Sequence, residues 1–516
     1  MGNSRRLYEV SRKLGTSMPH SPIDRRKFLA GAAAAGLGSS VFASSAPARS
    51  KIVSANEEVR VAILGAGWRG GQLAEAFSTA NGCRLVAFAD PDETLSRELA
   101  EKYSATAHSD LRKVLDDPNV DAVVISTCNH WHCLATLWAL DAGKDVYVEK
   151  PLSHTQWEGR QVVNAAAKSD RIVAFGTQQR SDPLQAKAKE FLHQEKALGK
   201  IKYVQANRLG TRASVGKRAT PLKLPTTTDY DLWLGPAADQ PILRDKLHYD
   251  WHWDFNTGSG EMGNWGVHIL DDIRNVAYQD SVTTPKSVVA AGGRVVWNDA
   301  ANSPNVHFAF FETETFPTMI TISNLPRTPD EKPNKKGKKR GWSVRAGMPV
   351  DGPASGYVVV CEGGYYFGQR HKGRAVDLQG KTIQTFEGGD IVPLHVQNFI
   401  DSVRARDTGM LNAPVEMGHH STGWANLANI AFHVGATYNR GQLDSAASLD
   451  AWPLLIDEME QQLAPFNVKT DQLLSSPVLN HDPVTEQFVG EHAELGNQFL
   501  KRTYREKFVV PEISKS

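Results

Sequence analysis

Short apolar runs alternate with amphipathic stretches between residues 58 and 176. The apolar runs are rich in Val, Ile, Leu and Ala and predict buried strands, whereas the stretches between them repeat apolar residues at helical spacing. Strands are expected over residues 59–64, 84–89, 120–126, 145–148 and 172–175. Helices are expected from about residue 68 and over residues 93–103, 110–115, 133–142 and 157–167. Strands that alternate with helices in this way predict a doubly wound parallel sheet.

The pattern changes beyond Gly176, where apolar and polar residues alternate in several segments. Strands are expected over residues 201–209, 287–297, 306–312, 318–324, 357–362, 365–368 and 382–386. Alternation predicts an open, mostly antiparallel sheet with one face packed and the other open to solvent or to a partner subunit. Late helices fit residues 394–404 and 418–434, and periodicity is then weak until residues 486–504.

The predicted fold class is therefore α/β, and the chain divides into three predicted regions. Residues 58–176 form the domain with the parallel sheet, and residues 177–465 form a second α/β domain that carries the antiparallel sheet. Residues 466–516 form a tail that is expected to wrap the surface.

Three glycines, Gly65, Gly67 and Gly70, follow the first predicted strand and indicate a dinucleotide site. In this fingerprint the first glycine permits a tight turn, the second lets the backbone touch a pyrophosphate, and the third allows close contact between helix and strand. The following helix directs unpaired N–H groups and its positive dipole end at that phosphate. The contacts expected in this turn are Gly65, Ala66, Gly67, Trp68, Arg69 and Gly70.

An acidic residue at the end of the second strand supports this interpretation. Asp90 follows Gly70 by twenty positions, where a carboxylate binds the ribose hydroxyls of the adenosine. Residues 91–93 contain no lysine or arginine that could bind a 2′-phosphate, so NAD is favoured over NADP. The alternative is a strand, turn and helix that bind nothing.

The composition excludes some classes of partner. The chain of 516 residues has a formal net charge of +1 with 22% charged residues, so no nucleic acid or other polyanion is implied. We interpret the basic run at residues 332–340 as a solvated loop. Cys83, Cys128, Cys133 and Cys361 lack the spacing of metal ligands or of a disulfide framework, so we expect buried thiols and no bound metal.

Residues 1–48 look like a twin-arginine signal peptide, followed by a linker over residues 49–57. Arg25 and Arg26 precede an Ala/Gly-rich run, and small residues follow that run. The run is shorter than the roughly 20 residues that span a bilayer, so no stable membrane anchor is expected. The twin-arginine machinery would export the folded chain, with its nucleotide, to the periplasm or the cell exterior. The alternative is a disordered basic tail.

Three polar segments complete the candidate chemistry. Residues 127–132 (Thr-Cys-Asn-His-Trp-His) and 149–151 (Glu-Lys-Pro) follow neighbouring strands at the edge where open α/β sheets bind ligands, and residues 258–271 read Gly-Ser-Gly-Glu-Met-Gly-Asn-Trp-Gly-Val-His-Ile-Leu-Asp. With the glycine fingerprint, they make residues 57–440 resemble the glucose-fructose oxidoreductase / inositol dehydrogenase (Gfo/Idh/MocA) family. The resemblance implies a Rossmann domain followed by an α/β domain whose open antiparallel sheet commonly forms dimers or tetramers.

The resemblance also implies roles for individual residues. Thr127, Asn129 and His132 would lie beside the cofactor, and Glu149 and Lys150 would lie at its nicotinamide end. Lys150 would orient the substrate hydroxyl and lower its pKa, because a cation beside a developing alkoxide eases the departure of a hydride.

The third segment would supply a general base. His268 would take the hydroxyl proton, and Asn264 lies four residues earlier, so that both side chains can face one cleft from a helix. Many dehydrogenases of the family carry Asp at the position of Asn264 and Pro at the position of Cys128. An amide keeps the hydrogen bonding of the Asp but removes a charge that would raise the basicity of His268.

Aromatic residues are concentrated between residues 230 and 265, which hold four of the twelve tryptophans. Indole faces suit the apolar C–H faces of a sugar ring, and polar neighbours can bond its hydroxyls, so a carbohydrate or polyol is the expected substrate class. The predicted substrate contacts are Gln179, Arg180, Trp251, His252, Trp253 and Asp271. The alternative is that these aromatic residues fill a core.

Export would constrain the chemistry, because no nicotinamide pool exists outside the cytoplasm to reoxidise NADH. We therefore expect NAD to stay tightly bound and to return to its starting state in every cycle. The first hypothesis is an NAD-dependent oxidoreductase that acts on the CH–OH group of a sugar or polyol. The alternatives are a redox-neutral NAD-dependent glycosidase and a catalytically silent protein that retains NAD as a structural element.

Overall fold

The computed structural model describes residues 58–331 and 343–515. The predicted export signal, the linker and the basic run at residues 332–340 lie outside these described residues, so all three stay predictions. Within the described ranges, no helix has both the length and the apolar character that crossing a bilayer requires.

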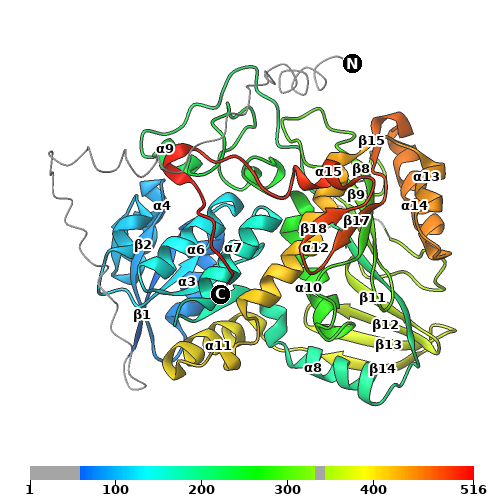
Figure 1. The fold of residues 1–516 in the computed structure, drawn as a ribbon, viewed down its shortest axis with the longest axis horizontal. Coiled ribbons are helices and arrows are strands. Elements are labelled where there is room, and N and C mark those ends of the chain that lie inside the picture. Colours follow the sequence, from blue (N-terminus) through cyan, green and yellow to red (C-terminus); the bar gives the residue numbers. More distant parts are fainter. Residues whose placement is uncertain (1–57, 332–342, 516) are drawn as a thin grey trace, which may run out of the picture. The chain divides into compact units, whose positions relative to one another are not determined.

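The N-terminal sheet is parallel throughout and has the strand order β3-β2-β1-β4-β5-β6, which confirms the predicted doubly wound sheet. Figure 1 shows two of its strands, β1 and β2, in blue beside their helices. The order reverses between β1 and β4, so the loops that follow these two strands diverge and leave a crevice at their carboxyl ends. The strands are β1 (Val59–Leu64), β2 (Cys83–Ala89), β3 (Thr106–His108), β4 (Ala122–Ile125), β5 (Asp145–Glu149) and β6 (Val173–Gly176).

Amphipathic helices pack against this sheet. Asp92 caps one helix, Asp110 caps another, and Thr155 forms a capping box with Glu158 at a third, which explains where these helices begin. The helices are α3 (Trp68–Ser78), α4 (Glu93–Tyr103), α5 (Leu111–Leu115), α6 (His132–Asp141) and α7 (Gln156–Ala167).

Helix α11 (Ile391–Ala405) comes from the second half of the chain but packs on the first sheet. The ring of its Phe399 lies 6.1 Å from that of Phe77 in α3 and 5.8 Å from that of Tyr147 in β5, measured between centroids. The core of the first domain therefore needs a segment that sequence analysis assigned to the second.

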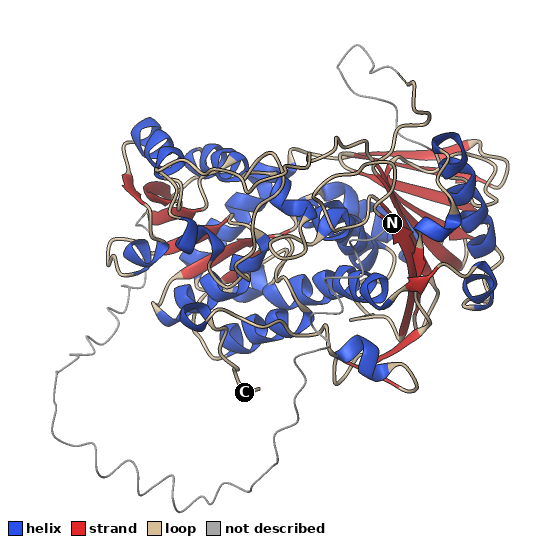
Figure 2. Ribbon diagram, turned by 90° about the horizontal axis from the view of Figure 1, so that it is seen from above, coloured by secondary structure: helices blue, strands red, loops and turns tan. Residues whose placement is uncertain are grey.

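The second sheet is larger and mostly antiparallel, as predicted, with β7 and β10 as its one parallel pair among the described residues. Figure 2 shows the strands of the two sheets as separate groups, each flanked by helices. The strands are β7 (Ile201–Leu209), β8 (Ser287–Gly293), β9 (Val306–Glu312), β10 (Thr318–Ser323), β11 (Ser355–Cys361), β12 (Gly364–Gln369), β13 (Lys372–Asp377), β14 (Thr382–Glu387), β15 (Ala436–Thr437), β16 (Leu474–Ser475), β17 (Leu479–Asp482) and β18 (Gln487–Val489).

The expectation of one open sheet face needs correction over strands β8, β9 and β10. Helices α10 (Val267–Val276) and α12 (Val415–Val434) pack on one face, and α14 (Ala451–Leu463) packs on the other. The Trp452 ring of α14 lies 6.0 Å from that of Phe308 and 5.6 Å from that of Phe310. Helix α14 was not predicted, and its apolar side buries the face that alternation left open.

The C-terminal tail does more than wrap the surface. Strands β16 and β17 both pair with β8 and so extend the large sheet. Within residues 486–504, the α-helix is limited to α15 (Ala493–Asn497). Farther on, Phe508 packs edge-on against Trp131 of the first domain, with ring centroids 5.5 Å apart. The tail therefore ties the two sheets together.

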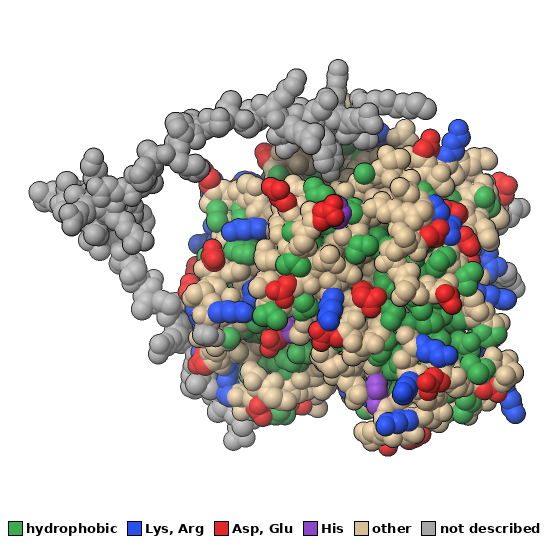
Figure 3. All heavy atoms as spheres, turned by 45° about the vertical axis from the view of Figure 1, so that its right-hand side comes forward, with side chains coloured by type: hydrophobic (Ala, Val, Ile, Leu, Met, Phe, Trp, Pro, Cys, Tyr) green, Lys and Arg blue, Asp and Glu red, His purple; other side chains and the backbone are tan. Residues whose placement is uncertain are grey.

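The surface charge agrees with the composition, whereas the expectation of buried thiols holds for two of the four cysteines. On the face drawn in Figure 3, basic and acidic side chains are interspersed. All four thiols are free; Cys133 and Cys361 are buried, and Cys83 and Cys128 are half-buried. Among the described residues, no group of three or more His, Cys, Asp or Glu side chains is arranged to hold a metal ion.

Candidate functional site

A cavity of about 720 Å³ opens at the carboxyl ends of the first sheet, where the strand order reverses, and its size is typical of a cofactor or ligand site. The second domain supplies the facing wall. The acidic end of the cavity contains Asp90 and Asp110. The basic end contains Lys150, Arg208, Arg212, Asn264, Trp265, His268 and Arg370.

The three glycines of the fingerprint have three different surroundings. Gly65 has a φ of +91°, and a Cβ there would lie 2.7 Å from the Ser126 backbone. A Cβ on Gly70 would lie 2.0 Å from the Gly65 carbonyl oxygen, whereas a Cβ on Gly67 would meet no atom within 4 Å. Helix α3 begins beside this open space with no capping side chain and no acidic residue in its first turn. The turn therefore has the room and the N–H donors that a pyrophosphate needs.

Ala66 and Gly70 do not line the cavity; the other predicted contacts of this turn do, namely Gly65, Gly67, Trp68 and Arg69. Ala66 instead positions Asp90, because its N–H donates to Asp90 Oδ2 over 2.8 Å. Asp90 Oδ1 accepts from the Asp92 N–H over 2.9 Å. Burial raises the pKa of Asp90 to about 6, although these two donors oppose the effect. Asp90 is thus mostly ionised at neutral pH and is held in place by the backbone.

Thr127, Asn129 and His132 follow β4 and line the middle of the cavity. The Thr127 hydroxyl oxygen and the Asn129 amide oxygen are buried without a hydrogen-bond partner among the described residues. The ring nitrogens of His132 lie 2.6 Å from the Pro151 carbonyl oxygen and 3.1 Å from that of Thr127, so His132 ties this loop to the end of β5. Buried polar atoms without partners are costly, and two beside one cavity fit a polar ligand such as a dinucleotide.

Glu149 ends β5 and pairs with the glycine turn. Its Oε1 accepts from Arg69 Nη2 over 2.7 Å and from Gln178 Nε2 over 3.1 Å. Burial alone would raise the pKa of Glu149, but the charges of Arg69 and Lys150 outweigh burial and hold the pKa below its ordinary value. Glu149 is therefore a fixed anion between the two ends of the cavity.

Lys150 projects toward a π-helical turn, Met262–Gly266, which directly precedes α10. Its Nζ donates to the Asn264 carbonyl oxygen over 2.8 Å and to Asn264 Oδ1 over 3.0 Å. The Asn264 amide in turn donates to Glu261 Oε2 over 3.2 Å, which fixes its orientation. Burial lowers the pKa of Lys150 to about 8, and the nearby Glu149 opposes this only in part. Lys150 is therefore cationic at neutral pH but close to its titration point.

His268 lies in the first turn of α10 and lines the basic end. The predicted helix is interrupted before it, since Asn264 belongs to the π-helical turn, yet both side chains line the cavity. Burial, with the charges of Arg370 and Lys150, lowers the pKa of His268 well below its ordinary value. The imidazole is therefore neutral, with one ring nitrogen free of a proton, but it is a weak base in this surrounding.

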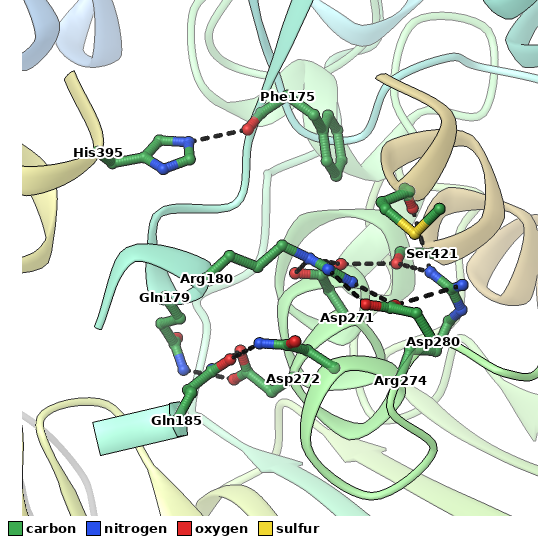
Figure 4. Close-up of polar contacts among 12 residues, drawn as sticks. Phe175, Gln179, Arg180, Gln185, Asp271, Asp272, Arg274, Asp280, His395 and Ser421 are labelled. Atoms are coloured by element: carbon green, nitrogen blue, oxygen red, sulfur yellow. Dashed lines mark hydrogen bonds and ion pairs between the residues drawn. The ribbon is translucent and has the colours of Figure 1, made fainter. Parts of the chain in front are cut away.

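Two predicted substrate contacts, Trp251 and His252, line the cavity, but the other four do not. Arg180 is committed to Asp271, at 2.8 Å and 2.9 Å, and to Asp280, at 2.9 Å and 2.8 Å (Figure 4). Asp271 also accepts from the Ser421 hydroxyl over 2.6 Å. This ion network joins the segment after β6 to α10 and α12, so the prediction that Arg180 and Asp271 contact substrate is corrected to a structural role.

Gln179 and Trp253 also lie behind the cavity wall. Gln179 donates to Asp272 (Figure 4). It also accepts from Arg370 Nε over 2.8 Å, so it supports a cavity residue. Trp253 is 4% exposed and packs beneath the Arg212 guanidinium, 5.5 Å from the ring centroid. Both predicted substrate contacts are corrected accordingly.

Sequence analysis missed the arginines of the basic end. Arg208 is the last residue but one of β7, Arg212 follows that strand, and Arg370 lies in the turn between β12 and β13. Glu261 pairs with Arg208 and with Arg212, each at 2.9 Å. No motif marks these positions. Only Arg208, which stands one residue before the end of a predicted strand, gave a local signal.

Residues 59–177 match an oxidoreductase family described as an NAD-binding Rossmann fold, and residues 212–303 match its C-terminal alpha/beta domain. Inositol 2-dehydrogenase 4 of Saccharopolyspora erythraea is 36% identical over 141 residues, which are 27% of this chain and 42% of that protein. A Glycosyl hydrolase family 109 protein of Solibacter usitatus is 33% identical over 162 residues, 28% of this chain and 37% of that protein. The alignments therefore span less than half the length of these curated relatives.

Solved structures show the same architecture. Levoglucosan dehydrogenase in complex with NADH and levoglucosan has a TM-score of 0.53 and 15% sequence identity, covering 73% of this chain and 97% of that chain. At this identity the likeness shows the shared fold of the two chains.

Proposed function

We propose that this chain belongs to the Gfo/Idh/MocA oxidoreductase family, whose two domain models match residues 59–177 and 212–303, and that it oxidises a CH–OH group of a sugar or polyol with a tightly held NAD. One observation carries the proposal: Lys150 has three N–H donors, and Asn264 accepts two of them at the basic end of the cavity. The third donor is left for a substrate hydroxyl.

The residues of the cavity fit a nicotinamide dinucleotide, which when bound supplies the hydride acceptor. The glycine turn would hold its pyrophosphate and Asp90 its adenosine ribose, while Thr127 and Asn129 offer partnerless oxygens along its length. Asp90, buried and mostly ionised at the acidic end, would repel a 2′-phosphate, whereas the second carboxylate there, Asp110, is paired with Arg112 at 2.7 Å. This supports NAD over NADP.

Residues 227–252, which we call the roof segment, support tight retention. The Asp229 N–H donates to the Pro91 carbonyl over 2.8 Å, and the Glu93 N–H donates to the Thr227 carbonyl over 3.0 Å. His248 Nε2 lies 3.0 Å from Asp92 Oδ2. These contacts hold the roof segment against the residues that follow Asp90. A bound nucleotide would have to break them, or find another path, in order to leave.

The chain's own residues account for the proton chemistry. The Lys150 ammonium would hydrogen-bond the substrate oxygen and stabilise it as an alkoxide. Neutral His268 would accept the hydroxyl proton. Asn264 would hold Lys150 in place and, since it carries no charge, would leave the basicity of His268 low.

The test begins with the intact protein purified in its folded state. Mass spectrometry after denaturation should release about one NAD per chain, and addition of a sugar or polyol should produce the near-ultraviolet absorbance of reduced nicotinamide on the protein. Lys150→Ala should abolish the absorbance change and keep the nucleotide. If Lys150→Ala reduced its cofactor as fast as the parent, the assignment of Lys150 would be wrong.

The Glycosyl hydrolase family 109 relative and the uncharged Asn264 favour a second candidate, a redox-neutral glycosidase. Its signature is release of nitrophenol from a nitrophenyl glycoside without net formation of NADH. A chain that retains NAD but shows neither activity would be a binding protein in which NAD is structural. The same preparation therefore separates all three functions.

Export by the twin-arginine route remains part of the proposal, with Arg25 and Arg26 as its motif. Fusion of residues 1–48 to a reporter that is active only after export tests it. Arg25→Lys combined with Arg26→Lys should block transport of the folded reporter. Equal transport by both fusions would exclude the route. The homo-oligomer that the family resemblance implies also stays a prediction.

A further inference from the structure

The basic end of the cavity carries more positive charge than its own carboxylates neutralise. Two carboxylates form ion pairs with these cations: Glu149 pairs with one cation and Glu261 pairs with two. The chain as a whole has a net charge of only +1, so this excess is local. The cations that line the cavity are Arg69, Lys150, Arg208, Arg212 and Arg370.

Arg370 and Lys150 are the two of these cations that form no ion pair within the described part of the chain, and only Arg370 offers two parallel donors. It lines the cavity, its guanidinium lies 4.5 Å from the centroid of the Trp265 ring, and its Nε donates to Gln179 Oε1 over 2.8 Å. Among the described residues it forms no ion pair, and neither of its Nη groups has a hydrogen-bond partner. A guanidinium held by its Nε and its flat face presents the Nη atoms as a free fork.

The fork is held rigidly from behind. Gln179, which accepts from Arg370, donates to Asp272, and Asp272 also accepts from Gln185 Nε2 over 2.7 Å (Figure 4). Asp272 does not line the cavity and makes no direct hydrogen bond to Arg370, although its charge is near enough to oppose the lowering of the Arg370 pKa by burial. A ligand in the cavity therefore meets the guanidinium and not the carboxylate behind it.

We propose that the substrate is a polyhydroxy acid, a sugar or polyol that carries a carboxylate, and that Arg370 binds this carboxylate. The inference rests on the proposed function, because it places the reacting hydroxyl at Lys150 and the acid group at Arg370. A planar guanidinium matches a carboxylate with two parallel hydrogen bonds. The Trp265 ring lies against the guanidinium groups of both Arg208 and Arg370, at 4.1 Å and 4.5 Å from its centroid, and so holds the fork in place. A neutral sugar would offer this half-buried fork no charged partner of its own, and only hydroxyl oxygens to its two Nη groups.

Calorimetric binding to the intact, nucleotide-loaded protein tests the inference. The probes are three acids, D-glucuronate, D-galacturonate and D-gluconate, each compared with its neutral counterpart, D-glucose, D-galactose or D-glucitol. We expect at least one acid to bind about 10- to 100-fold more tightly than its counterpart, as hydrogen bonds to a charged partner allow. If no acid exceeds its counterpart, or if D-glucose 6-phosphate binds more tightly than every acid, the proposal is overturned.

Variants assign the effect to Arg370. Arg370→Met should weaken acid binding by about 10- to 100-fold and leave neutral sugars within about threefold, and Arg370→Lys should restore part of the loss. Arg374→Met is the matched control, because Arg374 lies on the adjoining strand β13 and is exposed. A thermal melt identifies any variant that fails to fold. Equal loss for acids and neutral sugars in a folded Arg370→Met would contradict the inference.

The two proposals fail in different ways. If acids bind through Arg370 but neither reduce the bound nicotinamide nor are otherwise turned over, the carboxylate site stands and the oxidoreductase function falls. If neutral sugars are oxidised and acids neither bind nor react, the function stands and the carboxylate site falls. Because binding is measured apart from turnover, each result assigns the failure.

Discussion

The two ends of the cavity differ in how the chain builds them. The acidic end comes from consecutive strands and their loops, with Gly65, Gly67 and Asp90 all within one strand-helix-strand unit. The basic end gathers Lys150 from the first domain and Arg370 from the turn between two strands of the second. A site made of neighbouring elements keeps its geometry through local packing, whereas the basic end depends on how two domains meet.

This difference assigns different duties to the two ends. The acidic end offers fixed backbone donors and carboxylates and suits a component that every turnover shares. The basic end offers a lysine near its titration point and an arginine fork, which suit the group that reacts and the group that is recognised. Changes at the acidic end should therefore alter nucleotide content, and changes at the basic end should alter rate and substrate choice.

The largest expected effect is a loss of turnover when Lys150 is replaced at the basic end. Lys150→Met removes the only cation that Asn264 holds, so turnover should fall by about 10²- to 10⁴-fold, the range for a positioned proton donor or electrostatic stabiliser. NAD content should stay near one per chain. Lys113→Met on the surface helix α5 is the control and should match the parent. Loss of NAD in Lys150→Met would show that the two ends are not separable.

The next effect concerns the acidic end. Gly67→Ala places a methyl group in the open space reserved for the pyrophosphate, so NAD content should drop at least about tenfold while the fold is kept. Gly71→Ala is the matched control, because its Cβ would meet only Leu99 at 4.0 Å. That control should retain NAD and gain up to about 1 kcal/mol of unfolding free energy, as expected for alanine in place of a helical glycine. Full NAD content in Gly67→Ala would place the pyrophosphate elsewhere.

The comparison also explains what the sequence could predict. The parallel sheet, the glycine turn and Asp90 are local patterns, because hydrophobic periodicity and a fixed offset describe one continuous stretch. The roles given to Lys150 and His268 came from a motif, and both side chains line the cavity. The sequence therefore predicted those features that depend on residues close together in one stretch of the chain.

Long-range packing decided the rest. Arg180 and Asp271 are polar residues near the site, but each satisfies the other in a buried ion pair, and no pattern shows whether a charged side chain will face a cavity or a partner. Arg370 precedes β13, a strand that alternation did not reveal, and its neighbours Gln179 and Trp265 come from elements distant in sequence. Such juxtapositions appear only when the chain has folded.

NAD retention at the acidic end and turnover at the basic end should depend on pH in different ranges, because the pKa of Asp90 is raised to about 6 and that of Lys150 is lowered to about 8. Below pH 6 Asp90 loses its charge, so gel-filtered protein should retain less NAD. Above pH 8 Lys150 loses its proton, so turnover should fall about tenfold per pH unit. This descending limb should vanish in Lys150→Arg. A limb unchanged in that variant would assign the titration to another group.

The titration of Lys150 should also change the free energy of unfolding, which should rise with pH where turnover falls. The folded pKa of about 8 lies below the ordinary 10.5, so between these values the unfolded chain holds a proton that the folded chain has lost. The contribution of Lys150 to the free energy of unfolding therefore rises with pH across this window. Denaturant melts measure the free energy of unfolding of the parent and of Lys150→Met at the lower and the upper end of this pH window. The difference between the two proteins gives the contribution of Lys150. A parent that loses stability relative to the variant as pH rises would contradict the assigned shift.

The smallest expected effect tests whether the roof segment retains the nucleotide. His248→Ala removes the contact with Asp92, and because the His248 side chain is 46% exposed, the pair contributes little, so NAD should dissociate only about twofold to fivefold faster. Asp92→Asn keeps the cap of α4 and supplies the second arm of a double-mutant cycle. The double variant should lose NAD no faster than either single variant, since both remove one contact. If the two substitutions increased the rate of NAD dissociation independently, the two residues would act separately. The roof segment would then be held by its two backbone hydrogen bonds with Pro91 and Glu93.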